Sequence, residues 1–322
     1  MSPEPGSIGE LGEFGLIARI VADSPAGPAG VIVGPGDDTA VVAAPDGTVA
    51  VTVDMMVEGR HFKRDWSTPV DVGRRAAAAS LADLVAMGAR PTALVVGFAA
   101  PADLPAAWAL GCTAGLREEA AALGAAIVGG DVVESPVITI SVTALGDLGG
   151  RAPVLRSGAR PGDRIAVAGR LGWAAAGLML LSRGFRSPRA LVEAHRFPLP
   201  PYAEGLAAAQ GGATSMIDVS DGLIADALHV AQASGVRMCL STADWEIPEP
   251  MQAAAAAYHV EPTEWMLTGG DDHALLATFP ADVPLPAGFR AIGVVESSDG
   301  REPGVDVDAV ARDASGGFRH FA

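Results

Sequence analysis

Residues 31–57 read VIVGPGDDTAVVAAPDGTVAVTVDMMV, and this stretch decides the class of the fold. Short runs rich in valine alternate with a Gly-Pro-Gly turn and a Pro-Asp-Gly turn, which is typical of strands joined by tight turns. Residues 70–88 follow, rich in Ala, Leu and Val, and they lead into the Gly-Ala-Arg-Pro sequence that commonly ends a helix. Strands followed by a helix predict an α/β fold.

The same alternation continues to the end of the chain. Further helices are expected at 103–123, 171–183, 201–210 and 220–234. Further strands are expected at 125–131, 137–148, 215–219, 236–240, 273–279 and 289–295. The polar, turn-rich start of 156–169 precedes a new strand, so we place a domain boundary near residue 150. The expected domains are therefore 1–150 and 151–322, in line with a prior of about 150 residues per domain.

The charge balance restricts the classes of partner that the protein can bind. The chain has 38 acidic and 22 basic residues and a net charge of −16, which disfavours nucleic acid and anionic membranes. No apolar run approaches the roughly 18 residues of a membrane span. The first residues, MSPEPGSIGELGEFG, lack the basic and apolar regions of a signal peptide, so a cytoplasmic protein is expected. An anionic substrate would have to bring cations with it.

Two rare residue types restrict the chemistry further. Lys63 is the sole lysine, and because it follows Phe62 the chain has no Gly-Lys-Ser/Thr phosphate-binding loop. A Schiff-base mechanism would rest on this one residue, in a His-Phe-Lys-Arg segment that we interpret as exposed loop. Cys112 and Cys239 stand alone, which fits neither a disulfide framework nor a Cys-x-x-Cys metal site, so we interpret both as small buried residues.

Aspartates recur where an apolar strand or a small-residue helix meets glycine or another acid. They are Asp37, Asp38, Asp54, Asp83, Asp131, Asp218, Asp221, Asp271 and Asp272. Any one of them could be a turn former, and Asp221 could cap a helix. Together they indicate a ligand site, because acids at strand ends gather at one edge of an α/β sheet. Clustered carboxylates repel one another, and Mg²⁺, which prefers carboxylate oxygens and water, relieves that repulsion.

Asp83 is the most informative of these acids. In a helix over 70–88 it lies on the same stripe as Ala76, Ala79 and Ser80. An acid on a small-residue face is costly unless it is paired, so we expect a partner for it. The glycines that precede two other acids, Gly129–Gly130 and Gly269–Gly270, would let backbone N–H groups approach phosphate oxygens.

The ordered motifs resemble those of the thiamine-monophosphate kinase family, within the aminoimidazole ribonucleotide synthetase-like superfamily. They are GEFGLI, GDDTA, TVD with EGRHF, SLADLVAMGARP, VGGD, RSGARPGD, IDVSDGL, GGDDHALL and GGFRHF, from about residue 8 to 321. The resemblance implies an N-terminal ATP- and magnesium-binding domain whose sheet pairs in a homodimer, and a C-terminal α/β domain that completes the cleft. It also implies ATP-dependent phosphorylation of thiamine monophosphate to thiamine diphosphate, with several Mg²⁺ ions.

The resemblance also implies a role for individual residues. The implied metal ligands are Asp38, Thr52, Val53, Asp54, Asp83, Asp131, Asp218 and Asp221. The implied nucleotide contacts are Gly130, Asp131, Arg156, Ser220 and Thr113, and the implied contacts to the thiamine substrate are His61, Asp271 and Phe318. Asp54, Asp131 and Arg156 are the implied catalytic residues. Without the resemblance, His61 would be interpreted as a loop histidine and Phe318 as a packing residue, although an aromatic face also attracts a cationic ring.

Three positions depart from the family pattern. Val53 stands where Ser or Thr commonly precedes the aspartate, so a metal contact there would use the backbone carbonyl. GGDDH replaces GGEDY, which shortens the acid at Asp271 and places His273 where tyrosine is usual. Thr113 replaces a tyrosine that often touches the nucleotide.

Phosphoryl transfer suits this composition, because it demands positioning and charge neutralisation rather than covalent catalysis. Mg²⁺, helped by Arg156, would neutralise the phosphates in place of a phosphate-binding-loop lysine. The attacking phosphate monoester has a second pKa of about 6, so it needs no strong general base at neutral pH. We therefore expect direct in-line transfer without a phosphoenzyme.

Two alternatives remain open at this point. A superfamily relative could act on aminoimidazole ribonucleotide, selenide or a hydrogenase-maturation partner. The chain has no cysteine before Cys112, which argues against selenide, and the tail FRHFA offers no cysteine acceptor for the maturation reaction. The kinase-like ends disfavour the purine pathway. The other alternative is an inactive nucleotide- or thiamine-phosphate-binding protein, although a protein that only binds gains nothing from so many repelling carboxylates.

Overall fold

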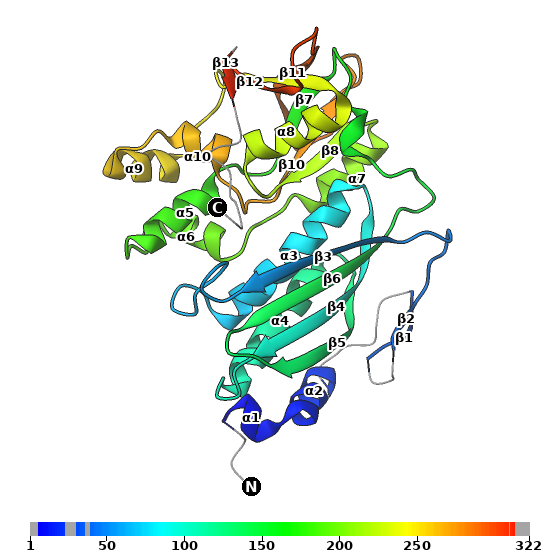
Figure 1. Ribbon diagram of the computed structural model, residues 1–322, viewed down its shortest axis with the longest axis vertical. Helices are drawn as coiled ribbons and strands as arrows, with labels where there is room; N and C mark the ends of the chain where they lie inside the picture. The colour runs from blue at the N-terminus through cyan, green and yellow to red at the C-terminus, as the bar shows by residue number, and fades with distance from the viewer. Residues whose placement is uncertain (1–5, 23–29, 36–38, 309, 313–322) are drawn as a thin grey trace. The chain divides into compact units, whose positions relative to one another are not determined.

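The fold is described from a computed structural model, in which residues 6–22, 30–35, 39–308 and 310–312 are placed well enough to describe. The chain divides into two units (Figure 1). The first contains Met1–Leu84 and Ala89–Arg151, and the second contains Val85–Gly88 and Ala152–Ala322. Each unit has its own sheet and its own helices, so the predicted α/β class is confirmed.

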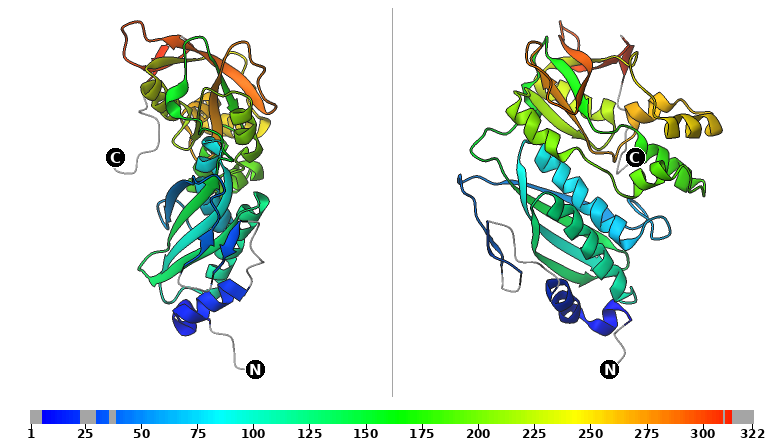
Figure 2. Two further views of the ribbon diagram at one scale, coloured as in Figure 1. Left: turned by 90° about the vertical axis from the view of Figure 1, so that its right-hand side faces the viewer. Right: turned by 180° about the vertical axis from the view of Figure 1, so that it is seen from behind.

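The first unit is built on a four-stranded sheet in the order β3-β6-β4-β5. Its strands are β3 (Ala50–Val57), β4 (Arg90–Ala100), β5 (Ala126–Glu134) and β6 (Thr139–Asp147). Helices α3 (Pro69–Ala86) and α4 (Ala106–Ala122) cover one face, as the right-hand view of Figure 2 shows. The short helices α1 (Ile8–Leu11) and α2 (Glu13–Ala22) and the hairpin of β1 (Val31–Val33) and β2 (Val41–Val42) complete the unit.

Helices α3 and α4 pack closely because glycines stand at their contact. A Cβ added at Gly73 would lie 1.9 Å from the carbonyl oxygen of Cys112, and one at Gly115 would lie 2.1 Å from that of Val70. No side chain fits at either position. The alanine-rich middle of α3 is buried on nearly all sides, which explains why this helix lacks the apolar stripe of a surface helix.

Strand β4 is absent from the sequence-based prediction. It lies between β6 and β5, so neighbours flank both of its edges, and its apolar run does not alternate with polar residues. Pro91, which the sequence indicates only as the end of the preceding helix, lies at the second position of β4. The pairing of β4 with β6 shifts register between Pro91 and Ala93.

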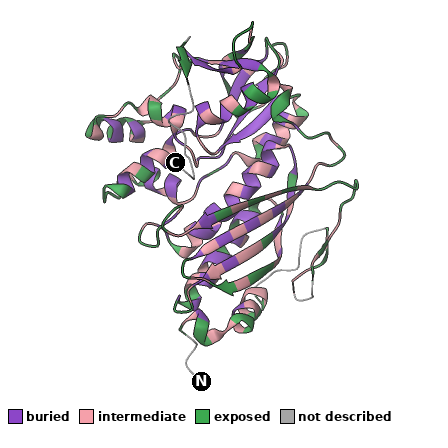
Figure 3. Cartoon of the chain, viewed as in Figure 1, coloured by how far each residue is buried: buried purple, intermediate pink, exposed green. Residues whose placement is uncertain are grey.

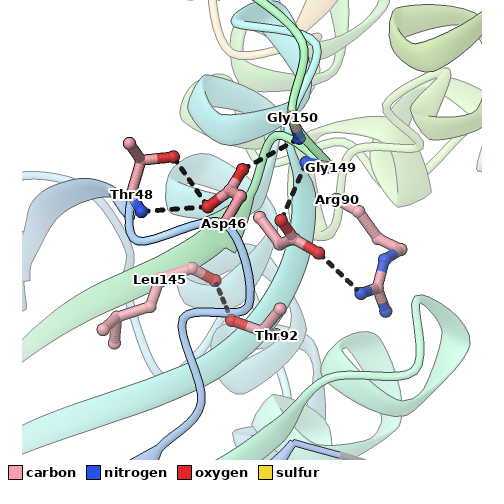
Figure 4. Close-up of polar contacts among 8 residues, drawn as sticks. Asp46, Thr48, Arg90, Thr92, Leu145, Gly149 and Gly150 are labelled. Carbon is pink, nitrogen blue, oxygen red and sulfur yellow. Dashed lines mark hydrogen bonds and ion pairs between the residues drawn. The ribbon is translucent and has the colours of Figure 1, made fainter.

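Hydrogen bonds to the side chain of Asp46 fix the turn that precedes β3. Asp46 accepts hydrogen bonds from the N–H and hydroxyl of Thr48, at 2.9 and 2.8 Å, and from the N–H of Gly150 at 2.8 Å (Figure 4). Asp147 accepts one from Gly149 and pairs with Arg90. The turn before β3 is thereby tied to the chain that leaves β6.

The second unit is built on a seven-stranded sheet in the order β13-β12-β9-β11-β7-β10-β8. Its strands are β7 (Arg164–Ala168), β8 (Ser215–Val219), β9 (Val236–Leu240), β10 (Ala274–Phe279), β11 (Phe289–Ser297), β12 (Gly304–Val307) and β13 (Val310–Arg312). Its helices are η1 (Arg156–Gly158), α5 (Trp173–Ser182), α6 (Arg189–Arg196), α7 (Tyr202–Gln210), α8 (Leu223–Ser234), α9 (Glu249–Tyr258) and α10 (Pro262–Thr268).

The core of the second unit lies against β7 and β10. Ala166, Leu275 and Phe279 are almost fully buried there, with Ala208 of α7. Helices α5, α7 and α8 match the predicted 171–183, 201–210 and 220–234, and α9 contains the alanine-rich run 253–257 that indicates a helix interior, whereas α6 and α10 are absent from the prediction. Cys112 is buried as expected, but Cys239 is partly exposed. Within the described parts of the chain, no helix has the length and apolar character that a membrane span requires.

Candidate functional site

Strand β3 and helix α3 bring four oxygen-bearing side chains together in the first unit. Thr52 Oγ1 donates to Asp83 Oδ2 across 2.6 Å, and Ser80 Oγ lies 2.8 Å from Asp54 Oδ2. Thr52 and Asp54 are two residues apart on the strand, and Ser80 and Asp83 are three apart on the helix, so each pair shares one face. The partner expected for Asp83 is therefore Thr52.

Ser80 belongs to this group although it was not among the predicted site residues. Its side chain is fully buried, and its Oγ also lies 3.0 Å from the carbonyl oxygen of Val142 on β6. The other three side chains of the group, Thr52, Asp54 and Asp83, are half-buried. The signal that could have found Ser80 was its place beside Asp83 on the helical stripe.

Val53 points the other way, because side chains alternate along a strand. Together with Val51 and Met55 it lies on the sheet face opposite α3, where its exposed fraction is 59%. Figure 3 shows intermediate and exposed residues along the strands of this open face.

Asp131 also lies on the open face. The register aligns Asp131 of β5 with Gly97, and Gly97 with Ser141, which in turn pairs with Met55. Its neighbour Gly130 falls in the row of Asp54, on the helix-covered face. Strands β3 and β5 are three strand spacings apart, about 14 Å. The structure therefore does not bring Asp131 to Asp54 within one chain.

Thr113 is buried within α4, and its hydroxyl donates to the carbonyl of Ala109 at 3.0 Å. The hydroxyl hydrogen is thus used within the helix, and the nucleotide contact of Thr113 stays a prediction.

His61 stands in a turn that follows β3. Its Nδ1 accepts the backbone N–H of Val57 at 2.9 Å, so the neutral ring carries its proton on Nε2. The next residue, Phe62, is buried and stacks on Trp108 with ring centroids 6.2 Å apart. The segment is thus anchored rather than an exposed loop throughout, although Lys63 itself is exposed, over the Trp66 ring.

In the second unit, two loops that carry predicted site residues are joined by backbone hydrogen bonds. The N–H of Asp271 donates to the carbonyl of Ser220 at 2.9 Å, and that of His273 donates to the carbonyl of Val219 at 3.1 Å. His273 Nδ1 also lies 3.0 Å from Asp218 Oδ2, with both side chains buried. Asp218, Ser220, Asp221 and Asp271 are thus gathered at one end of β8.

Two buried carboxylates hold the backbone around these loops. Asp226 Oδ2 accepts the N–H groups of Ser220, Asp221 and Gly222, and Asp272 accepts those of Trp173 and Ala174 at the start of α5. Burial raises the pKa of each carboxyl to about 7, against the lowering effect of the N–H donors. Asp226 was not singled out from the sequence. Its signal was an acid in the first turn of a helix.

Arg156 lies apart from those loops. The hydroxyl of Ser234, the last residue of α8, donates to the carbonyl of Arg156 at 2.8 Å, and the N–H of Met216 near the start of β8 donates to that of Leu155. Ser220 and Asp221 lie instead at the end of β8 and just before α8. The side chain of Arg156 is exposed.

Comparison with known proteins shows the family of the chain. Residues 36–148 match the family model "AIR synthase related protein, N-terminal domain". A thiamine-monophosphate kinase of Mycobacterium tuberculosis is 52% identical over 296 residues, which cover 92% of this chain and 88% of that protein. The chain belongs to the thiamine-monophosphate kinase family.

Other members of the thiamine-monophosphate kinase family resemble it across nearly the whole chain. The enzyme of Corynebacterium glutamicum is 39% identical over 98% of this chain and 95% of its own length. The structure of AaThiL complexed with AMPPCP and TMP has a TM-score of 0.77 and 33% identity, covering 97% of this chain and 98% of that one. These comparisons confirm the resemblance found in the sequence and the superfamily fold.

The oxygen-rich donor sets fit the Mg²⁺ that is expected for a member of the thiamine-monophosphate kinase family. Carboxylates and hydroxyls are hard ligands, and Mg²⁺ is commonly held by one or two carboxylates together with water and substrate phosphates. Among the described residues no group of three or more His, Cys, Asp or Glu side chains is close enough to form a complete metal centre. Asp37, Asp38 and Phe318 lie outside the described residues.

Proposed function

We propose that this protein transfers the γ-phosphate of ATP to thiamine monophosphate and releases thiamine diphosphate and ADP. The observation that carries the proposal is the 52% identity to a thiamine-monophosphate kinase over 92% of the chain. The relative AaThiL, bound to AMPPCP and TMP, supports both substrates. ATP as phosphate donor also argues for a cytoplasmic location.

Each unit would contribute magnesium ligands. In the first unit these are Asp54 and Asp83, with Thr52 and Ser80 holding one oxygen of each carboxylate. In the second unit they are Asp218, held by His273, and Asp221. Bound Mg²⁺ would neutralise the phosphate charge. Asp38, Thr52 and the backbone carbonyl of Val53 stay proposed ligands by family resemblance.

The reaction itself needs little from the side chains beyond positioning. An ionised oxygen of the thiamine monophosphate phosphate attacks the γ-phosphorus, the new P–O bond forms, and the bond to the leaving ADP oxygen breaks. His61, whose Nδ1 accepts the N–H of Val57, is proposed to contact the thiamine substrate. Ser220, Gly130 and Arg156 are proposed to contact the nucleotide, and Asp271 and Phe318 the thiamine moiety.

A product assay tests the proposal. Purified protein is incubated with ATP, MgCl₂ and one acceptor at a time: thiamine monophosphate, thiamine, or the formylglycinamidine ribonucleotide that is the substrate of aminoimidazole ribonucleotide synthetase. Thiamine diphosphate and ADP in equal amounts from the monophosphate alone are expected. Turnover of the ribonucleotide would favour the superfamily relative, and ATP binding without turnover of any acceptor would favour the inactive binding protein.

In-line transfer has its own test. ATP with a chiral γ-thiophosphate should give thiamine diphosphate with inverted configuration at phosphorus. Retention, or a phospho-aspartate that forms and decays as fast as turnover, would contradict direct transfer.

We also propose that the protein is a homodimer that pairs through the open face of the β3-β6-β4-β5 sheet. Val51, Val53 and Met55 are 66%, 59% and 57% exposed there, an apolar row of the kind that marks an interface. Val51→Lys should yield a monomer by light scattering, whereas Val310→Lys, at a valine 63% exposed in the second unit, should not. A monomeric wild type would contradict the proposal.

Asp131 lies on this open face and stays a proposed ligand by family resemblance. Because Asp54 lies on the helix-covered face of the same sheet, pairing of the open faces would not bring these two acids together.

A further inference from the structure

Asp226 has an unusual set of partners for a buried acid. Its side chain is 2% exposed, and a single oxygen, Oδ2, accepts the N–H groups of Ser220, Asp221 and Gly222 at 3.0, 3.0 and 3.2 Å. Successive N–H groups that converge just before a helix form an anion-binding concavity. Here a carboxylate from the first turn of α8 already fills that concavity.

The occupation of this concavity by the Asp226 carboxylate has two consequences. The N–H groups at the start of α8 are committed to Asp226, so phosphate charge must be met by other groups. The loop of residues 220–222 is also pinned from one side by Asp226. On the other side, the loop approaches the backbone of Thr268 closely at Gly222, at φ 118°, where an added Cβ would lie 2.5 Å from the carbonyl oxygen of Thr268.

The pinned loop carries the proposed metal ligands. Asp221 lies within it, and Asp218 lies three residues before Asp221, near the end of β8. The backbone of Ser220 is held a second time at its carbonyl, which accepts the N–H of Asp271. The direction of the Asp221 carboxylate therefore depends on the backbone that Asp226 holds.

We propose that Asp226 is a positioning residue for the metal ligands of the second unit: its carboxylate holds the loop of residues 220–222 so that Asp218 and Asp221 can bind a divalent cation. This inference rests on the proposed magnesium site but not on the identity of the acceptor substrate. Asp226 itself does not contact the metal. Partners that orient metal ligands typically change metal affinity by about 10- to 100-fold when they are removed.

The substitutions form a graded series. Asp226→Asn keeps an oxygen for the three N–H groups but loses the charge, and charge-assisted hydrogen bonds are about twice as strong as neutral ones. Asp226→Ala removes the acceptor altogether. Asp218→Asn serves as the reference for loss of a ligand.

Asp163 is the matched control. It is also a buried acid, and its Oδ2 accepts the N–H of Arg160 at 2.9 Å and the hydroxyl of Thr214 at 2.6 Å. It precedes β7, whereas Asp218 is two strands away, in the row of Ala168 at the other end of β7, which is about 17 Å along the strand direction. Asp163→Ala reports what loss of a buried carboxylate does to the fold alone.

The experiment measures binding of Mn²⁺ to the full-length chains by electron paramagnetic resonance, with AMPPCP present and without turnover. Asp226→Ala should weaken, by about 10- to 100-fold, the sites that Asp218→Asn removes, and Asp226→Asn should weaken them less. Asp163→Ala should lower the melting temperature and leave the Mn²⁺ affinity unchanged. If Asp226→Ala does not fold, the Mn²⁺ affinity of the Asp226→Asn chain tests the inference.

The inference is overturned if a folded Asp226 variant binds Mn²⁺ as the wild type does, or if Asp163→Ala weakens binding equally. It is also overturned if the wild type binds no Mn²⁺, because there would then be no site to position. Wild-type Mn²⁺ binding without phosphorylation of thiamine monophosphate would instead sink the proposed function and leave this inference standing.

Discussion

The hydroxyl of Thr52 on β3 donates a hydrogen bond to the carboxylate of Asp83 on α3, with 2.6 Å between the two oxygens. This bond joins the strand and the helix that carry the proposed magnesium ligands of the first unit. It also fixes one oxygen of a half-buried carboxylate that would otherwise lack this donor. The neighbouring bond between Ser80 and Asp54 repeats the arrangement two residues along the strand.

Thr52→Val should therefore reduce both stability and magnesium affinity. Loss of one hydrogen bond costs about 1 kcal/mol in the free energy of unfolding, and loss of an orienting partner costs about 10-fold in metal affinity. Urea unfolding and the Mg²⁺ dependence of the rate measure the two effects. Thr52→Ser keeps the hydroxyl and should stay near the wild type. Equal behaviour of the Val and Ser variants would refute an orienting role for Thr52.

Gly73 is predicted to tolerate no side chain. An added Cβ would lie 1.9 Å from the carbonyl oxygen of Cys112, so α3 and α4 would have to separate. Gly73→Ala should lower the free energy of unfolding by about 3 kcal/mol, at the upper end of overpacking costs. Gly129→Ala is the control, because nothing lies within 4 Å of its added Cβ. The close helix contact would be disproved by a Gly73→Ala chain as stable as the control.

The ion pair of Arg237 and Asp306 is predicted to be the strongest electrostatic contribution to the second unit's sheet. Its two bonds measure 2.5 and 2.7 Å between buried side chains, and the Arg237 hydrogen bond holds the pKa of Asp306 below its usual value. Asp306→Asn should cost about 3 kcal/mol of stability, because it leaves a buried guanidinium without its counter-ion.

The control for this pair is Glu264→Gln, which breaks the exposed pair with Arg312 and should cost no more than about 0.5 kcal/mol. The lowered pKa of Asp306 also sets the direction in which stability changes with pH. Because the folded-state pKa of Asp306 is lowered, its contribution is present above the unfolded pKa of 3.8 and is lost as the pH falls through the folded value. An Asp306→Asn chain that loses stability in acid as steeply as the wild type would contradict this.

Asp272 should make stability depend on pH in the opposite direction. Burial raises its pKa from 3.8 to about 7, so between these values the folded state binds more protons than the unfolded state. Stability then falls as the pH rises through that window. In EDTA, the melting temperature of the wild type should drop relative to that of Asp272→Asn between pH 5 and pH 8, because the amide cannot ionise. A difference that stays constant with pH would show that Asp272 is ionised throughout.

Some of the site could be predicted from the sequence because local periodicity governs it. Asp83 and Ser80 share a stripe on any helix over 70–88, and Thr52 and Asp54 share a face on any strand. Their pairing needed only that the helix cover that face. Asp226 escaped prediction because the same residue type in a first turn is usually a simple helix-stabilising acid.

The face of Asp131 could not be predicted. The β4–β5 pairing shifts register between Leu94 and Val95, so that Val95 pairs with Gly129 and Val128 is passed over. One extra residue in a strand turns every later side chain to the other face. Glycines at 129 and 130 are compatible with such a bulge but do not specify it. Without the shift, Asp131 would lie on the helix-covered face with Asp54.

The measurement that tests the central claim most directly is the rate of thiamine diphosphate formation from ATP and thiamine monophosphate as MgCl₂ is varied. It compares the wild type with Asp54→Asn at equal folded concentration, checked by circular dichroism. We predict a magnesium-dependent rate that falls by about 100-fold in the variant. No thiamine diphosphate from a folded, ATP-binding wild type at any magnesium concentration, or an unchanged magnesium dependence in Asp54→Asn, would contradict the account.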